Sequence, residues 1–141
     1  MATPTGHDYG AWAFVKDGAG GDWDADAIAD NATLTSNTAI DLDTKSACEI
    51  GIILVEDNTG AIDGDVTIYV LGVGGGMADE QTDVGSPWAF ALTPVQNDTV
   101  PKTFSVSPLH YGSFKIAVKN ESGQELAVSV KVRTADVPVA S

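Results

Sequence analysis

The alternation of apolar and polar positions is clearest from Gly112 to Arg133. A period of two is typical of a strand with one buried face and one exposed face. The apolar members of the alternation are Phe114, Ile116, Val118, Leu126, Val128, Val130 and Val132. The basic members, at the opposite parity, are Lys115, Lys119, Lys131 and Arg133. The segment Asn120-Glu121-Ser122-Gly123 between the two runs holds typical turn residues. The pattern therefore predicts a β-hairpin with one apolar and one basic face.

Similar runs upstream predict further strands. They cover residues 11–15, 38–43, 47–56, 65–73, 86–93 and 102–107. The run 47–56 is apolar at both parities, so we expect a central strand covered on both faces, with 65–73 as its partner. No segment sustains a helical period. About eight short strands separated by turn residues indicate an all-β protein, an antiparallel β-sandwich of jelly-roll or immunoglobulin-like type.

The strands fall within one predicted domain, residues 11–133. Residues 1–10 are expected to form a flexible N-terminal arm, and residues 134–141 an extended C-terminal tail. Long acidic or glycine-rich loops are expected at 16–31 and 72–85.

The sequence from Ile53 to Gly60 aligns weakly with that from Ile116 to Gly123. Each segment is an apolar strand that ends in an Asx residue, a Ser or Thr, and a Gly, before a valine-rich return strand. The similarity indicates two related hairpins, which are either an internal repeat or two turns that use the same few residue types.

Acidic residues outnumber basic ones 20 to 7, which gives a net charge of −13. Such a charge argues against nucleic acid or an anionic membrane as a partner. The C-terminal part, residues 112–141, is the exception, because its basic residues slightly outnumber its acidic ones. The predicted hairpin is thus the one basic element of an acidic protein.

Other composition features bear on location. Cys48 is the single cysteine, so no intrachain disulfide forms, and we expect it to be a small buried hydrophobe. The N-terminal residues do not resemble a signal peptide, and no apolar run is long enough to cross a bilayer. We therefore expect synthesis in a cytoplasm.

One acidic pattern suggests metal binding. Asp22, Asp24 and Asp26 alternate as in the start of a calcium loop. Ala27 and Thr33 stand where an EF-hand needs Gly and Glu, so only a calcium site of another kind is open. The alternative is a solvated acidic loop.

Catalytic patterns are missing from the sequence. The glycines at 72–76 are not followed by the Lys-Ser/Thr of a phosphate loop. His7, His110 and Ser86 belong to no recognisable catalytic arrangement. We expect a protein that is not an enzyme and needs no cofactor.

The positions of the three tryptophans can be interpreted in two ways. Trp12 and Trp88 lie in apolar runs and are predicted to be core residues, whereas Trp23, in the acidic loop, is predicted to be exposed and to anchor a contact. Alternatively, all three could form a sugar-stacking platform on one face of the sandwich.

Two segments carry a resemblance to a known class of proteins. Trp88-Ala89-Phe90 before a proline-bounded strand, and the run from Gly112 to Gly123, resemble the small β-sandwich structural proteins of tailed bacteriophage virions, especially head decoration (cement) proteins. The resemblance implies a virion part present in many copies, commonly a symmetric homo-oligomer, that binds the major capsid protein or other virion subunits. It also implies terminal arms that become ordered on neighbouring subunits.

The residues expected to contact the capsid are Lys115, Lys119, Lys131, Arg133 and Trp23. A plainer alternative is that the four basic residues only form the wet face of an edge hairpin, where lysine discourages stray strand pairing. Other functions left open are a tail or neck component of the virion and a carbohydrate- or calcium-binding module.

Overall fold

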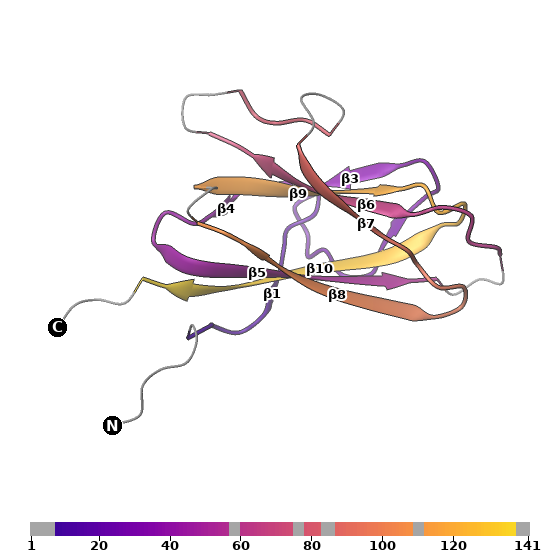
Figure 1. Ribbon diagram of the computed structural model, residues 1–141, viewed down its shortest axis with the longest axis horizontal. Coiled ribbons are helices and arrows are strands. Elements are labelled where there is room, and N and C mark those ends of the chain that lie inside the picture. Colours follow the sequence, from indigo (N-terminus) through magenta and orange to yellow (C-terminus); the bar gives the residue numbers. More distant parts are fainter. Residues whose placement is uncertain (1–7, 57–59, 75–77, 83–86, 109–111, 138–141) are drawn as a thin grey trace.

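The computed structural model describes residues 8–56, 60–74, 78–82, 87–108 and 112–137. Two antiparallel sheets stack face to face (Figure 1). The described residues contain ten strands and no helix, so the prediction of an all-β sandwich is confirmed, with more strands than the eight or so expected. Consequently, none of the described residues form a helix that could cross a membrane.

The first sheet, called sheet I, has the strand order β1-β10-β5-β8, and β2 also pairs with β10. Its strands are β1 (Ala13–Phe14), β2 (Asp26–Ile28), β5 (Lys45–Val55), β8 (Thr99–Val106) and β10 (Leu126–Asp136). The second sheet, called sheet II, has the order β3-β9-β6-β7, and β4 also pairs with β9. Its strands are β3 (Thr33–Thr35), β4 (Ile40–Asp41), β6 (Val66–Gly72), β7 (Trp88–Leu92) and β9 (Ser113–Asn120).

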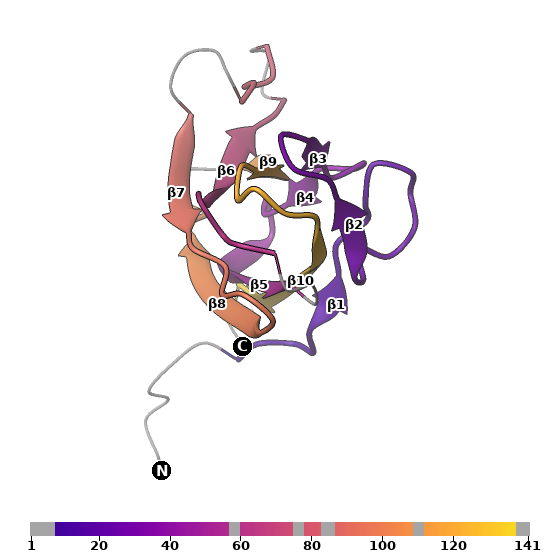
Figure 2. The ribbon, with the colours of Figure 1, turned by 90° about the vertical axis from the view of Figure 1, so that its right-hand side faces the viewer.

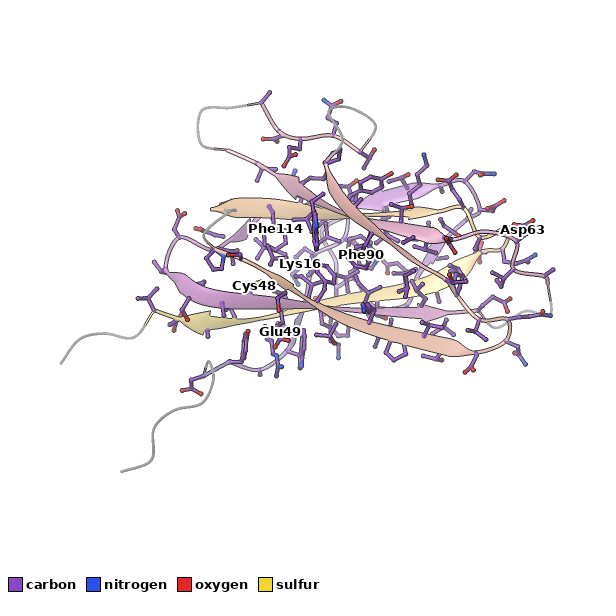
Figure 3. All side chains as sticks on the ribbon, viewed as in Figure 1. Lys16, Cys48, Glu49, Asp63, Phe90 and Phe114 are labelled. Carbon is purple, nitrogen blue, oxygen red and sulfur yellow. The ribbon has the colours of Figure 1, made fainter. Side chains whose placement is uncertain are left out.

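The core lies between the sheets and is built from alternate positions of the four long strands. The side chains that are at most 1% exposed there include Ile50, Ile52, Leu54, Val66, Ile68, Val70, Phe114, Ile116, Val118, Leu126, Val128 and Val130. Cys48 belongs to this cluster, as predicted, and burial raises the pKa of its thiol to about 12. Figure 3 shows Cys48, Phe90 and Phe114 between the sheets, while Glu49 points away from them.

The predicted C-terminal hairpin is wrong. β9 pairs with β6 in sheet II, whereas β10 pairs with β5 in sheet I. The apolar rows of β9 and β10 were correctly assigned to a buried face, but they face each other across the core. Alternation shows which side of a strand is buried and does not identify the neighbour that pairs with it. As a result, Lys115 and Lys119 lie on the outside of sheet II and Lys131 and Arg133 on the outside of sheet I, so the single basic face does not exist.

The predicted pairing of 47–56 with 65–73 is wrong for the same reason. β5 belongs to sheet I and β6 to sheet II, so the chain crosses between sheets here as well. β5 is central, as predicted, between β10 and β8, but its outward positions are only half-buried.

The two crossings lie side by side at one end of the sandwich. The amide of Asp63 donates to the carbonyl of Ser122 at 2.9 Å, and the amide of Glu121 donates to the carbonyl of Asp65 at 3.1 Å. The aligned segments of the weak repeat are therefore both crossings between sheets and not hairpins. Residues 57–59 of the first segment lie outside the described residues.

Parts of both predicted arms belong to sheet I. Tyr9 bridges to Ala135, and the amide of Gly10 donates to the carbonyl of Thr134 at 2.9 Å. β10 itself extends to Asp136, beyond the expected end of the domain at residue 133. The remaining arm residues, 1–7 and 138–141, lie outside the described residues, as do His7, His110 and Ser86.

A candidate binding groove on the outer face of sheet I

The segment from Tyr9 to Phe14 runs antiparallel beside β10 at the edge of sheet I, and its aromatic side chains contact basic residues of that strand. The Phe14 ring lies 4.6 Å from Nζ of Lys131, which is its partner in the β1–β10 register. The guanidinium of Arg133 lies 4.6 Å from the Tyr9 ring and 4.7 Å from the Trp12 ring. Cation–π contacts of this kind contribute roughly 0.5–2 kcal/mol each. Three aromatic side chains therefore hold the N-terminal segment on the sheet.

Arg133 is also bound to an acid. Its Nε donates to Oε1 of Glu49 at 2.9 Å, and its Nη2 donates to the same oxygen. Both side chains are partly buried, so the ion pair is less screened by solvent than a fully exposed one. The structure thus gives Arg133 an intramolecular role that the capsid-contact hypothesis did not include.

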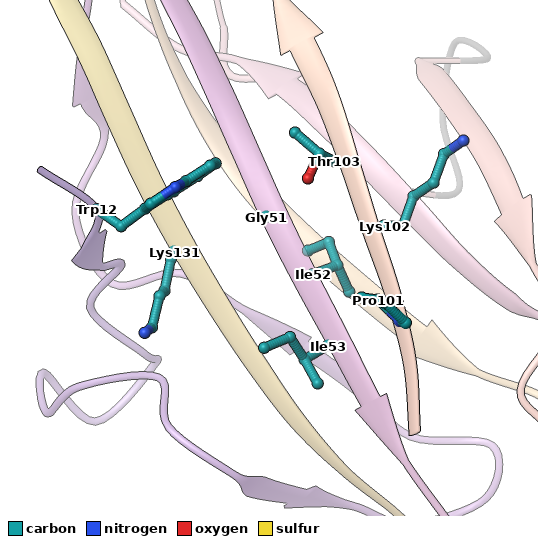
Figure 4. Close-up of a pocket in the computed structure, with 8 residues that line it drawn as sticks. All are labelled: Trp12, Gly51, Ile52, Ile53, Pro101, Lys102, Thr103 and Lys131. Atoms are coloured by element: carbon teal, nitrogen blue, oxygen red, sulfur yellow. The ribbon is translucent and has the colours of Figure 1, made fainter. Parts of the chain in front are cut away.

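Trp12 forms one wall of a groove that runs over β10, β5 and β8 (Figure 4). The groove has a volume of about 270 Å³ and is lined by Trp12, Gly51, Ile52, Ile53, Pro101, Lys102, Thr103 and Lys131. The Trp12 ring packs over Gly51, where an added Cβ would lie 3.4 Å from the ring, at ordinary contact distance. Trp12 is 37% exposed, which leaves much of the ring available to a ligand.

One cation beside the groove lacks an acidic partner. Four of the seven basic residues form salt bridges within the described residues, namely Lys16–Asp22, Lys45–Asp136, Lys119–Glu121 and Arg133–Glu49. Lys102, Lys115 and Lys131 have no such partner in the described part of the chain. Lys131 lies on the outer face beside the groove. Lys102 also contributes to the lining, but it is opposite the core residue Ile52 in the β5–β8 register, and its side chain points away from Trp12 and Lys131 (Figure 4). Lys115 lies on the outside of sheet II.

The prediction for Trp23 is wrong, because its side chain is fully buried in the core. The loop before it closes through the Lys16–Asp22 salt bridge of 2.7 Å. The Trp23 amide then donates to the carbonyl of Val15 at 2.8 Å, and its carbonyl accepts from the amide of Val130 at 3.0 Å. These bonds turn the indole inward although its sequence neighbours are acidic, so Trp23 cannot anchor a partner.

Trp12 and Trp88 were predicted to be core residues, and this is also wrong. Trp12 covers the outside of sheet I, and Trp88 is 45% exposed at the edge of sheet II. Since Trp23 is buried, the three tryptophans do not form a shared platform. A tryptophan in a short apolar run can therefore lie at the edge or on the outer face of a sandwich as well as in its core.

The three carboxylates of the candidate calcium loop do not converge. Asp22 pairs with Lys16, and Asp26 shares a hydrogen bond with Asp17. The described residues contain no group of three or more His, Cys, Asp or Glu side chains that could hold a metal ion. Burial, the hydrogen bond to Asp17, and the charges of Asp17 and Asp24 raise the pKa of Asp26 to about 6. The hydrogen bond to Asp26 is the main cause that lowers the pKa of Asp17.

Comparisons with known proteins identify no family. No protein-family model and no curated protein matches the chain. One solved structure that is similar is a carbohydrate-binding module, CBM6cm-2 from Cellvibrio mixtus lichenase 5A, in complex with cellotriose. The match covers 92% of this chain and 87% of that chain, with 14% sequence identity and a TM-score of 0.41. A likeness at this level assigns neither a family nor a ligand to this chain.

Several groove residues were not recognised in the sequence. Gly51, Pro101, Lys102 and Thr103 had no assigned role. Gly51 carried a usable signal, because a glycine inside an otherwise apolar strand often marks a close approach by another group. The partner that approaches, Trp12, is distant in sequence and could not be identified from that signal.

Proposed function

We propose that this chain is a non-enzymatic structural protein of a bacteriophage virion that docks on the capsid surface through the Trp12 groove. The observation that carries the proposal is Lys131, a lysine without an acidic partner in the described part of the chain, beside the half-exposed Trp12. The rest of this acidic protein would repel an acidic partner. This groove attracts one, so an acidic patch on the major capsid protein fits it.

The groove has features that are typical of protein interfaces. Tryptophan is enriched among the residues whose truncation costs binding most, typically by about 2 kcal/mol or more. Trp12 is already held in place by Arg133 and Gly51, so little conformational entropy is lost when a partner covers it. Lysines at the rim mainly raise the association rate and select the partner. The acidic loops elsewhere keep the protein soluble on the particle.

Particles that lack this protein provide the test, because purified variants can be added back and the bound amount measured. Lys131→Glu and Trp12→Ala are expected to weaken binding by about tenfold or more. Lys115→Glu is the matched control, since this lysine also lacks an acidic partner but lies on the opposite sheet. Unchanged binding of Lys131→Glu, or equal loss in both charge reversals, would rule out docking through this groove. Micrographs of the same particles would separate a head location from a tail or neck location.

The same groove supports a second candidate function, the binding of a saccharide. An exposed indole beside the Thr103 hydroxyl and the Lys131 ammonium offers a stacking surface with hydrogen-bond donors at its margin. This candidate predicts that the isolated protein binds a polysaccharide in the absence of any particle, and that Trp12→Ala abolishes the binding. Retention of the Trp12→Ala variant on the polysaccharide would refute it.

A further inference from the structure

Two strands end the sheets on the same side of the sandwich, β7 in sheet II and β8 in sheet I (Figure 2). An edge strand offers unpaired backbone groups to any other strand, and proteins commonly protect such edges with proline or lysine. β8 has both, in Pro101 and Lys102. β7 has neither, since its sequence is Trp-Ala-Phe-Ala-Leu. Of these two edges, only β7 is unprotected.

The inner face of β7 is also incompletely covered. Trp88, Phe90 and Leu92 point toward the core, opposite the buried residues of β6. Ring centroids of Trp88 and Phe90 lie 5.7 Å apart, and those of Phe90 and Phe104 4.8 Å apart. The aromatic row closes the gap between the sheets but remains open on its outer side, where Trp88 is 45% exposed.

Charge selects the partner that this edge can accept. Each copy of the chain carries a net charge of −13, so most approaches between two copies bring acidic groups together. Residues 87–97 contain no charged side chain. Two carboxylates at the ends of the β6–β7 pair are hydrogen-bonded within the chain: Asp65 accepts from the Thr93 hydroxyl at 2.7 Å, and Glu80 accepts from the Gly72 amide at 2.7 Å. The β7 edge therefore lets two like-charged copies meet without acid–acid contact.

The strand is self-complementary in an antiparallel pair. A two-fold axis at Phe90 places each Phe90 opposite its symmetry mate and each Trp88 opposite Leu92 of the partner subunit. On the other face, Ala89 lies opposite Ala91 of the partner subunit, and both are small. Isologous contacts of this kind close with two copies, which is the commonest form of oligomer.

We infer that β7 pairs with β7 of a second copy, which joins the two sheets II into one continuous sheet across a two-fold axis. The contact lies on a different surface from the Trp12 groove and does not depend on what the protein docks on. It would continue the aromatic row from one sandwich into the next and complete the backbone hydrogen bonds of the edge.

The test is the mass of the isolated protein in solution, measured by sedimentation at increasing concentration. The wild type is expected to form dimers. Ala89→Lys with Ala91→Lys places two lysines directly opposite two lysines, which is expected to raise the dimer dissociation constant by about tenfold or more. Ala89→Lys with Ala91→Glu places opposite charges in the same register and is expected to keep the dimer.

Thr99→Lys with Ser105→Lys is the control, because it adds the same charge to the exposed face of the protected edge strand β8 and leaves the lining of the Trp12 groove unchanged. Lysine makes the protein less acidic, so a general charge effect would strengthen association in both double-lysine variants. A monomeric wild type would overturn the inference. So would a dimer that survives Ala89→Lys with Ala91→Lys, or one that is lost equally in the β8 control.

Discussion

Replacement of Trp23 tests the packing of the core most directly. The side chain is 0% exposed and is the largest of the fully buried ones. Truncation of such a residue to alanine removes its contacts and leaves a cavity, at a cost of about 3–5 kcal/mol. A domain of this kind is stable by about 5–15 kcal/mol, so Trp23→Ala should lose about a fifth or more of the free energy of unfolding.

The indole also has an unfavourable feature. Its Nε1–H group is buried without a hydrogen-bond partner in the described part of the chain. Burial of an unsatisfied donor costs about 1–3 kcal/mol. Trp23→Phe removes this donor while it keeps most of the ring, so its loss of stability should be less than half that of Trp23→Ala.

Urea unfolding followed by far-ultraviolet circular dichroism measures both variants without relying on tryptophan emission. Trp12→Ala is the control, because this exposed ring mainly contributes a cation–π contact worth about 1 kcal/mol. If Trp23→Ala were no more destabilising than Trp12→Ala, the burial of Trp23 would be wrong. If Trp23→Phe cost as much as Trp23→Ala, the reasoning about the unsatisfied donor would fail.

Three further predictions concern the surface and the crossings between sheets. The pKa of Asp26 is raised from 3.8 to about 6, so protonated Asp26 stabilises the fold fully below pH 3.8, and this stabilisation is lost as the pH rises through about 6. Asp26→Asn should remove this decrease in the free energy of unfolding, as measured by urea titrations between these two pH values. Arg133→Ala should speed hydrogen exchange at the Gly10 amide, since the aromatic contacts that hold the N-terminal segment are lost; unchanged exchange would contradict that role. Gly123 has φ of +91° and its added methyl would overlap the Asp63 carboxylate, so Gly123→Ala should cost about 1–3 kcal/mol in thermal unfolding; an unaltered midpoint would count against this geometry.

The strands could be located from the sequence because burial on one face imposes alternation. β6 and β9 lie within predicted runs, whereas β5 begins before its run and β10 ends after its own; the inward residues were correctly assigned in β9 and most of β10. Pairing could not be predicted in the same way. Two strands that face each other across the core have the same pattern as the two strands of a hairpin.

The candidate site was harder to predict because it joins segments that are distant in sequence. Lys131 was recognised as a possible contact, but its neighbours in the groove come from β5, β8 and the N-terminal segment. Trp12 was predicted to be buried and Trp23 to be exposed, whereas the structure shows the opposite. The polarity of the flanking residues does not determine how a loop closes. The charge-free run 87–97 was visible in the sequence, yet its position at a sheet edge depends on the strand order.

The order of the strands affects when this protein can fold. β10, the last described strand, lies near the middle of sheet I, between β1 and β5. Until β10 has been synthesised, β5 therefore lacks one of its two neighbours, and one side of the core is incomplete. Pairing between such distant segments is slow, because loop closure must precede the gain from the contacts. Folding of the sandwich should consequently wait until β10 has left the ribosome, and a nascent chain stalled before β10 should bind chaperones that recognise exposed apolar strands.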